Sequence, residues 1–257
     1  MTSIDNQTGA FLKSLPFFSG LSEASLNAFA EAGRVRTYRK QEHMVQQGDK
    51  ADVFFVVMNG WIKLCRQTSE GDESVVAVFT RGDVFGEAAI FTGAGYPYTA
   101  EAAEETRTFE IPAAVLEKQA RENPDILKRV MAAMTREIEK QQMNNEHMAL
   151  MSSSQRVGCL LLQLSASMIG TGGTFTFPYD KSLAAAQLGM KPETFSRSLA
   201  QLKEADVESR GTEVKVESFC ALAKFCCKNC TAEGKCAGYR AEPVQKSATA
   251  VARKVYA

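Results

Sequence analysis

Residues 181–200 read KSLAAAQLGMKPETFSRSLA, a pattern typical of two short helices joined by a tight turn. Ala185 falls where two crossing helices approach closely, so only a small side chain fits there. Gly189, four residues later, supplies the positive φ that the turn needs. Phe195 is the apolar residue that fills the angle between the helices, and Pro192 stands at the expected first position of the second helix. The spacing predicts a helix-turn-helix.

The flanking sequence has the element order of a winged helix-turn-helix module. A helical run, QRVGCLLLQLSASM at 155–168, comes first, and GTGGTFTFP at 170–178 follows as a loop and short strand. After the helix pair, EVKVES at 213–218 alternates as a strand does. We therefore expect a DNA-binding domain over residues 154–218.

The second helix carries the candidate DNA-reading residues, because its first turns face base edges when such a helix enters a major groove. Arg197 can donate two hydrogen bonds to guanine, and Glu193 can accept one from a cytosine amino group. The candidate DNA-contacting residues are Lys191, Glu193, Thr194, Ser196 and Arg197. Basic residues placed for phosphate contacts are Lys191, Lys203, Arg210 and Lys215. Residues 181–216 carry a net charge of about plus one, so we expect dimerisation to be needed for affinity.

An all-β region precedes this module. Its β-rich runs are VFFVV at 53–57, WIKL at 61–64 and SVVAVF at 74–79. Glycines separate them at roughly the spacing of a barrel or roll. In front lies SEASLNAFAEAG, a short amphipathic helix with Ser22 as its cap and Gly33 as its stop. We expect a β-roll sensor domain over residues 1–120.

Between the two regions, residues 124–152 form a helical run in which the only Gly or Pro is Pro124 at its start. A heptad seam runs along it, formed by Leu127, Met131, Met134, Ile138, Gln141, Asn145 and Met148. The seam predicts a dimerisation helix over residues 121–153, with the polar Gln141 and Asn145 fixing register and two-chain pairing. The alternative is a long helix that lies on its own β domain.

Composition narrows the function classes. The 257 residues carry 30 basic and 30 acidic side chains, so a nucleic-acid partner must be met by a local patch. No apolar run is long enough to span a membrane, and the first residues lack a signal peptide, so we expect a soluble, cytoplasmic protein without a membrane partner. Common catalytic motifs do not occur, and two histidines leave little room for acid–base catalysis. We expect no enzyme activity.

The chain resembles the CRP/FNR family of bacterial transcription regulators over about residues 15–218. The matching motifs are QQGD at 46–49, FFVVMNGWIKL at 54–64, GDVFGE at 82–87, YTAEA at 98–102 and ETFSR at 193–197. The resemblance implies an α+β fold with a cyclic-nucleotide-binding-type β-roll, a long dimerisation helix and a C-terminal winged helix-turn-helix. It also implies a homodimer that binds double-stranded DNA at a palindromic operator with TTGAT-like half-sites, read by Glu193, Ser196 and Arg197. RNA polymerase is a further partner that the resemblance allows.

The family's cyclic-nucleotide cassette pairs Gly-Glu with an Arg-Ser about ten residues later. Gly86 and Glu87 are present here, but Tyr98 and Thr99 occupy the second pair of positions. Without a guanidinium the phosphate of cAMP loses its main charge partner. The sequence therefore predicts a structural remnant at Gly86 and Glu87 and no cAMP binding.

Five of the seven cysteines lie in the last 38 residues, which we expect to form a cysteine-rich tail over residues 219–257. Cys227, Cys230 and Cys236 have C-x2-C-x5-C spacing, which can place thiolates around one metal centre. This array resembles the C-terminal cluster site of FNR proteins from bacilli and the WhiB-type cluster proteins, which implies a [4Fe–4S] iron-sulfur cluster. The preferred ligands are Cys220, Cys227, Cys230 and Cys236. Cys226 and an external Asp or Glu remain alternative ligands.

Other cofactors stay open. Structural zinc would suit a closed four-thiolate site, and the tail cysteines could instead form a thiol switch or be inert. The family's nitrogen-oxide sensors bind haem, for which His43 and His147 are the available axial ligands. The leading hypothesis is a regulator that senses oxygen, nitric oxide or redox state through the cluster. Its alternatives are a haem-dependent nitrogen-oxide sensor and a redox or zinc-stapled protein without sensing.

Overall fold

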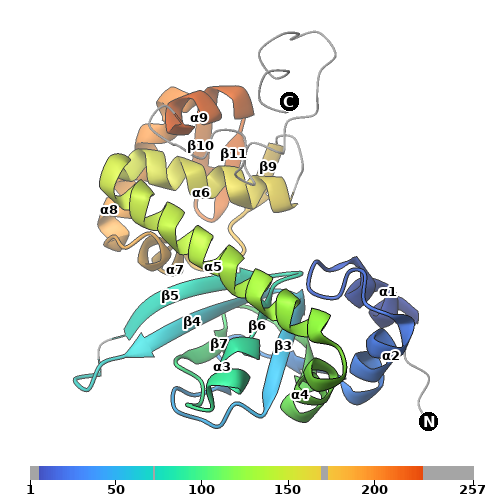
Figure 1. Ribbon diagram of the computed structural model, residues 1–257. Coiled ribbons are helices and arrows are strands. Elements are labelled where there is room, and N and C mark those ends of the chain that lie inside the picture. Colours follow the sequence, from blue (N-terminus) through green and yellow to red (C-terminus); the bar gives the residue numbers. More distant parts are fainter. Residues whose placement is uncertain (1–5, 72, 169–172, 228–257) are drawn as a thin grey trace, which may run out of the picture. The chain divides into compact units, whose positions relative to one another are not determined.

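A computed structural model describes residues 6–71, 73–168 and 173–227 of the chain (Figure 1). It divides into two compact units, one ending at Glu139 and the other beginning at Lys140. The helices of the first unit are α1 (Asn6–Ser14), α2 (Glu23–Ala32), α3 (Glu87–Thr92), α4 (Ala113–Glu122) and the first half of α5 (Pro124–Leu150). Those of the second unit are the rest of α5, α6 (Ser153–Met168), α7 (Lys181–Gln187), α8 (Pro192–Gln201), the 3-10 helix η1 (Leu202–Ala205) and α9 (Phe219–Cys226).

The first unit is a β-roll of two antiparallel four-stranded sheets. One sheet has the order β1 (Arg34–Tyr38), β8 (Thr106–Pro112), β3 (Val53–Asn59), β6 (Val84–Phe85). The other has the order β2 (His43–Val45), β7 (Thr99–Ala102), β4 (Trp61–Gln67), β5 (Glu73–Thr80). The three β-rich runs of the sequence fall in β3, β4 and β5, which confirms the predicted roll.

Helices cover the first sheet and build one core with it. Ser22 caps α2 by accepting a hydrogen bond from the backbone N–H of Ser25, and α2 ends at Gly33, as predicted. Phe29 of α2 meets Phe54 of β3 in an edge-to-face contact with ring centroids 6.3 Å apart. Ile126 of α5 is fully buried in the same core, so the first half of α5 belongs to this unit.

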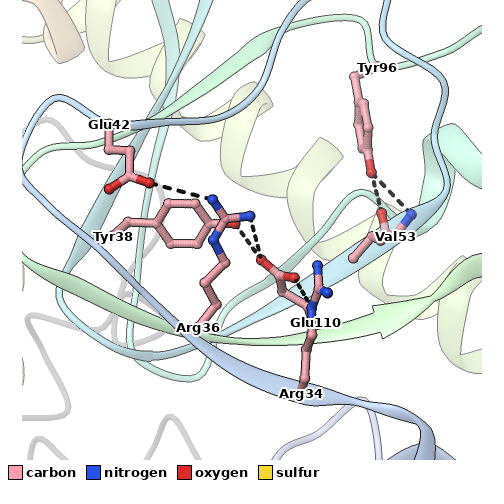
Figure 2. Close-up of polar contacts among 7 residues, drawn as sticks. All are labelled: Arg34, Arg36, Tyr38, Glu42, Val53, Tyr96 and Glu110. Carbon is pink, nitrogen blue, oxygen red and sulfur yellow. Dashed lines mark hydrogen bonds and ion pairs between the residues drawn. The ribbon is translucent and has the colours of Figure 1, made fainter.

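The interior between the two sheets is filled by aromatic side chains. Phe85 stacks on Phe55 and on Phe79, with ring centroids 4.8 and 5.6 Å away. Tyr96 and Tyr98 lie beside this stack, and the Tyr96 hydroxyl donates a hydrogen bond to the carbonyl of Val53 (Figure 2). Tyr98, which stands at one of the two expected Arg-Ser positions, is therefore packed beside this stack.

A buried carboxylate ties the first sheet together. Glu110 of β8 accepts hydrogen bonds from the phenol of Tyr38 and from Nε of Arg34, the latter at 2.8 Å (Figure 2). The guanidinium of Arg36 lies over the Tyr38 ring, 4.4 Å from its centroid, and also contacts Glu42. The charge of the buried carboxylate is therefore balanced from the exposed side of β1.

The second unit is built around α6, which packs against α8 and α9. A three-stranded antiparallel sheet completes it, in the order β10 (Val207–Arg210), β11 (Glu213–Val216), β9 (Gly173–Thr176). The run EVKVES falls on β11, as predicted. Phe175 and Phe177, in and after β9, pack toward Phe195, so the sheet supports the helix pair α7 and α8.

Candidate nucleic-acid interface

The helix pair α7 and α8 has the geometry expected from residues 181–200. Ala185 and Phe195 are fully buried at the crossing. Gly189 adopts a φ of 61°, and the N–H of Met190 donates to the carbonyl of Ala185, which closes the turn. Pro192 stands at the first position of α8 with Lys191 as the N-cap residue. The turn fixes the angle at which α8 presents its first residues.

Four of the five candidate reading residues lie on the outer surface of α8. Lys191, Glu193, Ser196 and Arg197 are exposed, whereas Thr194 is half-buried. Thr194 was expected to be exposed, but it precedes the buried Phe195 and turns partly toward the core. Nε of Arg197 donates to the backbone carbonyl of Glu193 at 3.4 Å, so the guanidinium lies along its own helix. Its remaining donors are available to a base.

Three of the four residues expected to contact phosphate lie in or next to the hairpin of β10 and β11, whereas the fourth, Lys191, is the N-cap residue of α8. Lys203 of η1, Arg210 of β10 and Lys215 of β11 are exposed. Arg210 and Lys215 form exposed ion pairs with Glu208 and Glu217, and such pairs are worth little in water. A shallow groove lined by Lys203, Ser209 and Arg210 runs between the hairpin and the end of α8. Basic side chains therefore lie beside the reading helix.

Arg156 of α6 is a residue that the sequence analysis missed. It donates a hydrogen bond of 2.7 Å from a terminal guanidinium nitrogen to the carbonyl of Leu188, in the turn of the helix-turn-helix. The two residues are 32 positions apart, so no local pattern relates them. Met148 of α5 lies against the same turn, since a side chain at Gly189 would stand 3.4 Å from its terminal methyl.

The predicted heptad seam forms an exposed face along α5. Met131 is 66% exposed, Ile138 55% and Met148 57%. Gln141 and Asn145 are exposed as well. In contrast, Ile126 and Val130 of the same helix are buried in the core of the first unit. The alternative of a helix lying on its own β domain therefore describes one face of its first half, and the seam residues are exposed among the residues that the structure describes.

The tail cysteines differ in burial. Cys220 is exposed on α9, and Cys227 is half-buried at the C-cap position directly after that helix. Cys226 is fully buried and faces α6, where a side chain at Gly158 would stand 2.3 Å from its sulfur. Its sulfur therefore packs against α6. Cys230 and Cys236 lie outside the described residues.

The cassette region of the roll contains a buried carboxyl group. Glu87 is 6% exposed, and its Oε2 has no hydrogen-bond partner among the described residues. Burial raises the pKa of Glu87 to about 7, and burial also raises the pKa of the Tyr98 phenol, with a further rise from Glu87 nearby. Thr99 accepts a hydrogen bond from the N–H of Gln47. The two residues in the Arg-Ser positions are thus held by the roll itself.

The two histidines lie in different places. His43 is on the exposed edge of β2, with Nε2 3.3 Å from the carboxylate of Glu101. His147 is buried in the second unit, and burial lowers its pKa. Neither belongs to the aromatic cluster that fills the roll.

Comparison with known proteins matches two domain families to these units. The cyclic nucleotide-binding domain matches residues 35–123, and the Crp-like helix-turn-helix domain matches residues 155–225. The transcriptional activator protein FnrA of Stutzerimonas stutzeri is 28% identical over 197 residues, which cover 74% of this chain and 80% of that protein. No helix in the described part of the chain is long and apolar enough to cross a membrane.

Solved structures agree with these matches. A regulatory protein from Silicibacter pomeroyi DSS-3, named for cAMP binding, is 32% identical, and the match covers 85% of this chain and 97% of that chain with a TM-score of 0.65. FixK2 from Bradyrhizobium japonicum is 22% identical, with 75% and 96% covered and a TM-score of 0.67, which supports the fold alone.

Proposed function

The chain belongs to the CRP/FNR family of transcription regulators, and from this premise we propose that it acts as a homodimer that binds a palindromic operator and responds to oxygen, nitric oxide or redox state. The relatives named above are regulators, in keeping with a protein that is not an enzyme. The observation that carries the DNA-binding part is the surface of α8. Its buried Phe195 fixes the helix, while Glu193, Ser196 and Arg197 face outward from its first two turns.

The exposed seam of α5 supports the homodimer. Burial of the apolar seam side chains in an interface would stabilise a dimer by roughly 25 cal/mol per Å² of apolar surface removed from water. Two seams pairing in parallel would bring two reading helices to one DNA duplex with two-fold symmetry, which is the arrangement that a palindrome requires. The low net charge of the DNA-binding domain makes this second set of contacts necessary for tight binding.

The proposed sensor is a [4Fe–4S] cluster held by Cys220, Cys227, Cys230 and Cys236. The described donors suit this role, because Cys220 is exposed on α9 and Cys227 is half-buried at its C-cap, while Cys226 faces inward. Lys224 is exposed on the same helix and would favour thiolates there. When bound, such a cluster supplies sensitivity to oxygen and nitric oxide.

We do not propose cAMP as the effector. Recognition of a cyclic phosphate would need a cationic partner, and Tyr98 and Thr99 stand where the family's cassette has its arginine and serine. Glu87 is buried with an unpaired oxygen, and the neighbouring aromatic stack fills the roll. In this proposal the roll therefore binds no nucleotide and holds the first half of α5 through their shared core.

Two experiments test the proposal. Selection of bound sequences from random duplex DNA should recover a dyad with TTGAT-like half-sites, and recovery of no common sequence would refute specific operator recognition. Anaerobic purification followed by iron and sulfide analysis should give brown protein that loses iron when Cys227, Cys230 or Cys236 is replaced by serine. Cys226→Ser is the matched control and should keep its iron. A sharp Soret band would indicate haem, and colourless zinc-loaded protein would exclude iron-based sensing.

A further inference from the structure

A small cavity in the second unit gathers polar and reactive side chains behind the turn of the helix-turn-helix. Its volume is about 50 Å³, enough for one or two water molecules. His147 of α5 and Arg156, Cys159 and Gln163 of α6 line it, and the backbone region of Gln187 and Leu188 closes it on the side of the turn. The DNA-reading surface and the tail cysteines do not include this cluster.

We propose that Cys159 is an oxidation site, at which peroxide converts the thiol to a sulfenic acid and thereby changes operator affinity. Cys159 is 5% exposed, so its sulfur is reached through the cavity rather than from the outer surface. The cavity accepts a molecule as small as peroxide and has no space for a nucleotide or a haem.

Two hydrogen-bond donor groups line the cavity together with Cys159. Nε2 of Gln163 lies 3.6 Å from the sulfur and donates to it. Arg156 is three residues before Cys159 on the same face of α6, and its buried Nε has no hydrogen-bond partner among the described residues. An amide donor and a guanidinium both stabilise a thiolate or a sulfenate. His147 lines the same cavity, and burial lowers the pKa of its imidazole.

Cys65 in the other unit shows the opposite environment. Its thiol donates a hydrogen bond to the carboxylate of Glu73 at 3.0 Å, and burial together with that carboxylate raises its pKa to about 12. Such a thiol is not ionised at neutral pH and does not react. The two buried cysteines therefore differ in their hydrogen bonds, since the Cys65 sulfur donates to a carboxylate that is itself paired with Lys63, whereas the Cys159 sulfur accepts from an amide.

The reaction balances with hydrogen peroxide as the oxidant. The thiolate sulfur attacks one peroxide oxygen, an S–O bond forms as the O–O bond breaks, and sulfur loses two electrons. The departing hydroxide takes up the proton that the thiol released, which gives one water for each sulfenic acid formed. A dithiol such as dithiothreitol restores the cysteine in two steps. Its first thiol displaces water from the sulfenic acid to form a mixed disulfide, and its second thiol attacks that disulfide, which releases the Cys159 thiol and leaves the reagent as its own disulfide.

The coupling to DNA runs through Arg156. The same guanidinium that faces the cavity donates to the carbonyl of Leu188 in the turn before α8. A sulfenate oxygen in the cavity would compete for that guanidinium, since a charged acceptor forms a stronger hydrogen bond than a carbonyl. Loss of the bond to Leu188 would loosen the turn that sets the position of α8.

The test uses the full chain with Cys220, Cys227, Cys230 and Cys236 all changed to serine, so that the tail is silent. Peroxide followed by dimedone should label the peptide that contains Cys159, and operator affinity should fall about tenfold and recover with dithiothreitol. Adding Cys159→Ser should leave the starting affinity within about twofold and abolish the peroxide response. Cys159→Ala provides a second variant without the thiol. Cys65→Ser is the matched control and should respond as the parent does.

Each readout can overturn the proposal. Absence of label on Cys159 would refute the oxidation site whether or not the chain binds an operator, because labelling does not depend on DNA. Labelling without a change in affinity would refute the coupling, and so would a peroxide response that survives in both Cys159 variants. Gln163→Leu should slow labelling several-fold without changing the starting affinity, and an unchanged rate would contradict the role given to the amide.

Discussion

The sulfur of Cys226 lies in the space that a side chain at Gly158 would need. A Cβ atom built on Gly158 stands 2.3 Å from that sulfur and 3.1 Å from a methyl carbon of Leu222. Gly158 is in the middle of α6 with ordinary helical geometry, so it is required for the close approach of α9 rather than for its backbone angles. The absence of a side chain there sets the separation of α6 and α9.

Gly158→Ala should therefore destabilise the second unit by about 1–3 kcal/mol, because an added methyl overpacks a closed contact. The free energy of unfolding in urea measures this effect. Gly158→Ala combined with Cys226→Ala should recover most of the loss, since the smaller side chain makes room. Gly9→Ala is the control, because among the described residues outside its own helix turn no atom lies within 4 Å of the position of a Cβ at Gly9. Equal losses in the single and double variants would contradict the contact.

Glu87 should make stability depend on pH. Burial raises its folded pKa to about 7 from an ordinary value of 4.5, so the folded chain holds this proton more tightly than the unfolded chain. The contribution of the protonated Glu87 to the free energy of unfolding is therefore fully present below pH 4.5 and is lost as the pH rises to about 7. Glu87→Gln keeps the shape of the protonated form and should remove this dependence. At pH 8 we expect the free energy of unfolding of the variant to exceed that of the unchanged protein by about 1–3 kcal/mol.

Urea unfolding of both proteins at acidic and alkaline pH measures the Glu87 effect. The difference between them should be small at about pH 4.5 and should grow toward about pH 8. A difference that stays constant over this range would show that the carboxyl group titrates normally.

The seam of α5 predicts a dimer that a single charge can disrupt. Met131→Lys places an ammonium group at a central seam position, so sedimentation equilibrium should show a shift toward monomer of at least about tenfold in the dissociation constant. Ala132→Lys adds the same charge one residue away, at an exposed position outside the seam, and should leave the dimer intact. Equal effects of the two lysines would contradict pairing through the seam.

Local patterns in the sequence predicted α2, the strands β3, β4 and β5, and the helix-turn-helix with its flanking elements. The helix-turn-helix could be predicted because Ala185, Gly189 and Phe195 lie within eleven consecutive residues and determine one turn. The start of α2 could be predicted because Ser22 caps the helix that directly follows it. Long-range polar contacts were not predictable in this way. Tyr38 and Glu110 are 72 residues apart, and each is an ordinary strand residue until the sheet pairs β1 with β8.

In the candidate site, too, local patterns were predictable from the sequence and long-range contacts were not. The outward positions of Glu193, Ser196 and Arg197 follow from helical periodicity once Phe195 is placed in the core. The burial of Cys226 does not, because it depends on Gly158 in another helix. The sequence placed Cys227 among the preferred ligands and kept its neighbour Cys226 as an alternative, but it could not show that Cys226 is buried while Cys227 is half-buried.

Arg197 should determine sequence preference at one position of each half-site. An arginine that donates two hydrogen bonds to guanine is worth about 1–3 kcal/mol of discrimination against other bases. Arg197→Ala should therefore bind the selected operator and its single-base variants at that position with nearly equal affinity, measured by fluorescence anisotropy on a panel of duplexes. Arg210→Ala is the matched control, because this exposed arginine on β10 is placed for phosphate. It should weaken binding to every duplex alike and reduce the dependence of affinity on salt by about one ion per subunit. If instead Arg210→Ala changes the base preference and Arg197→Ala does not, the hairpin rather than α8 reads the DNA.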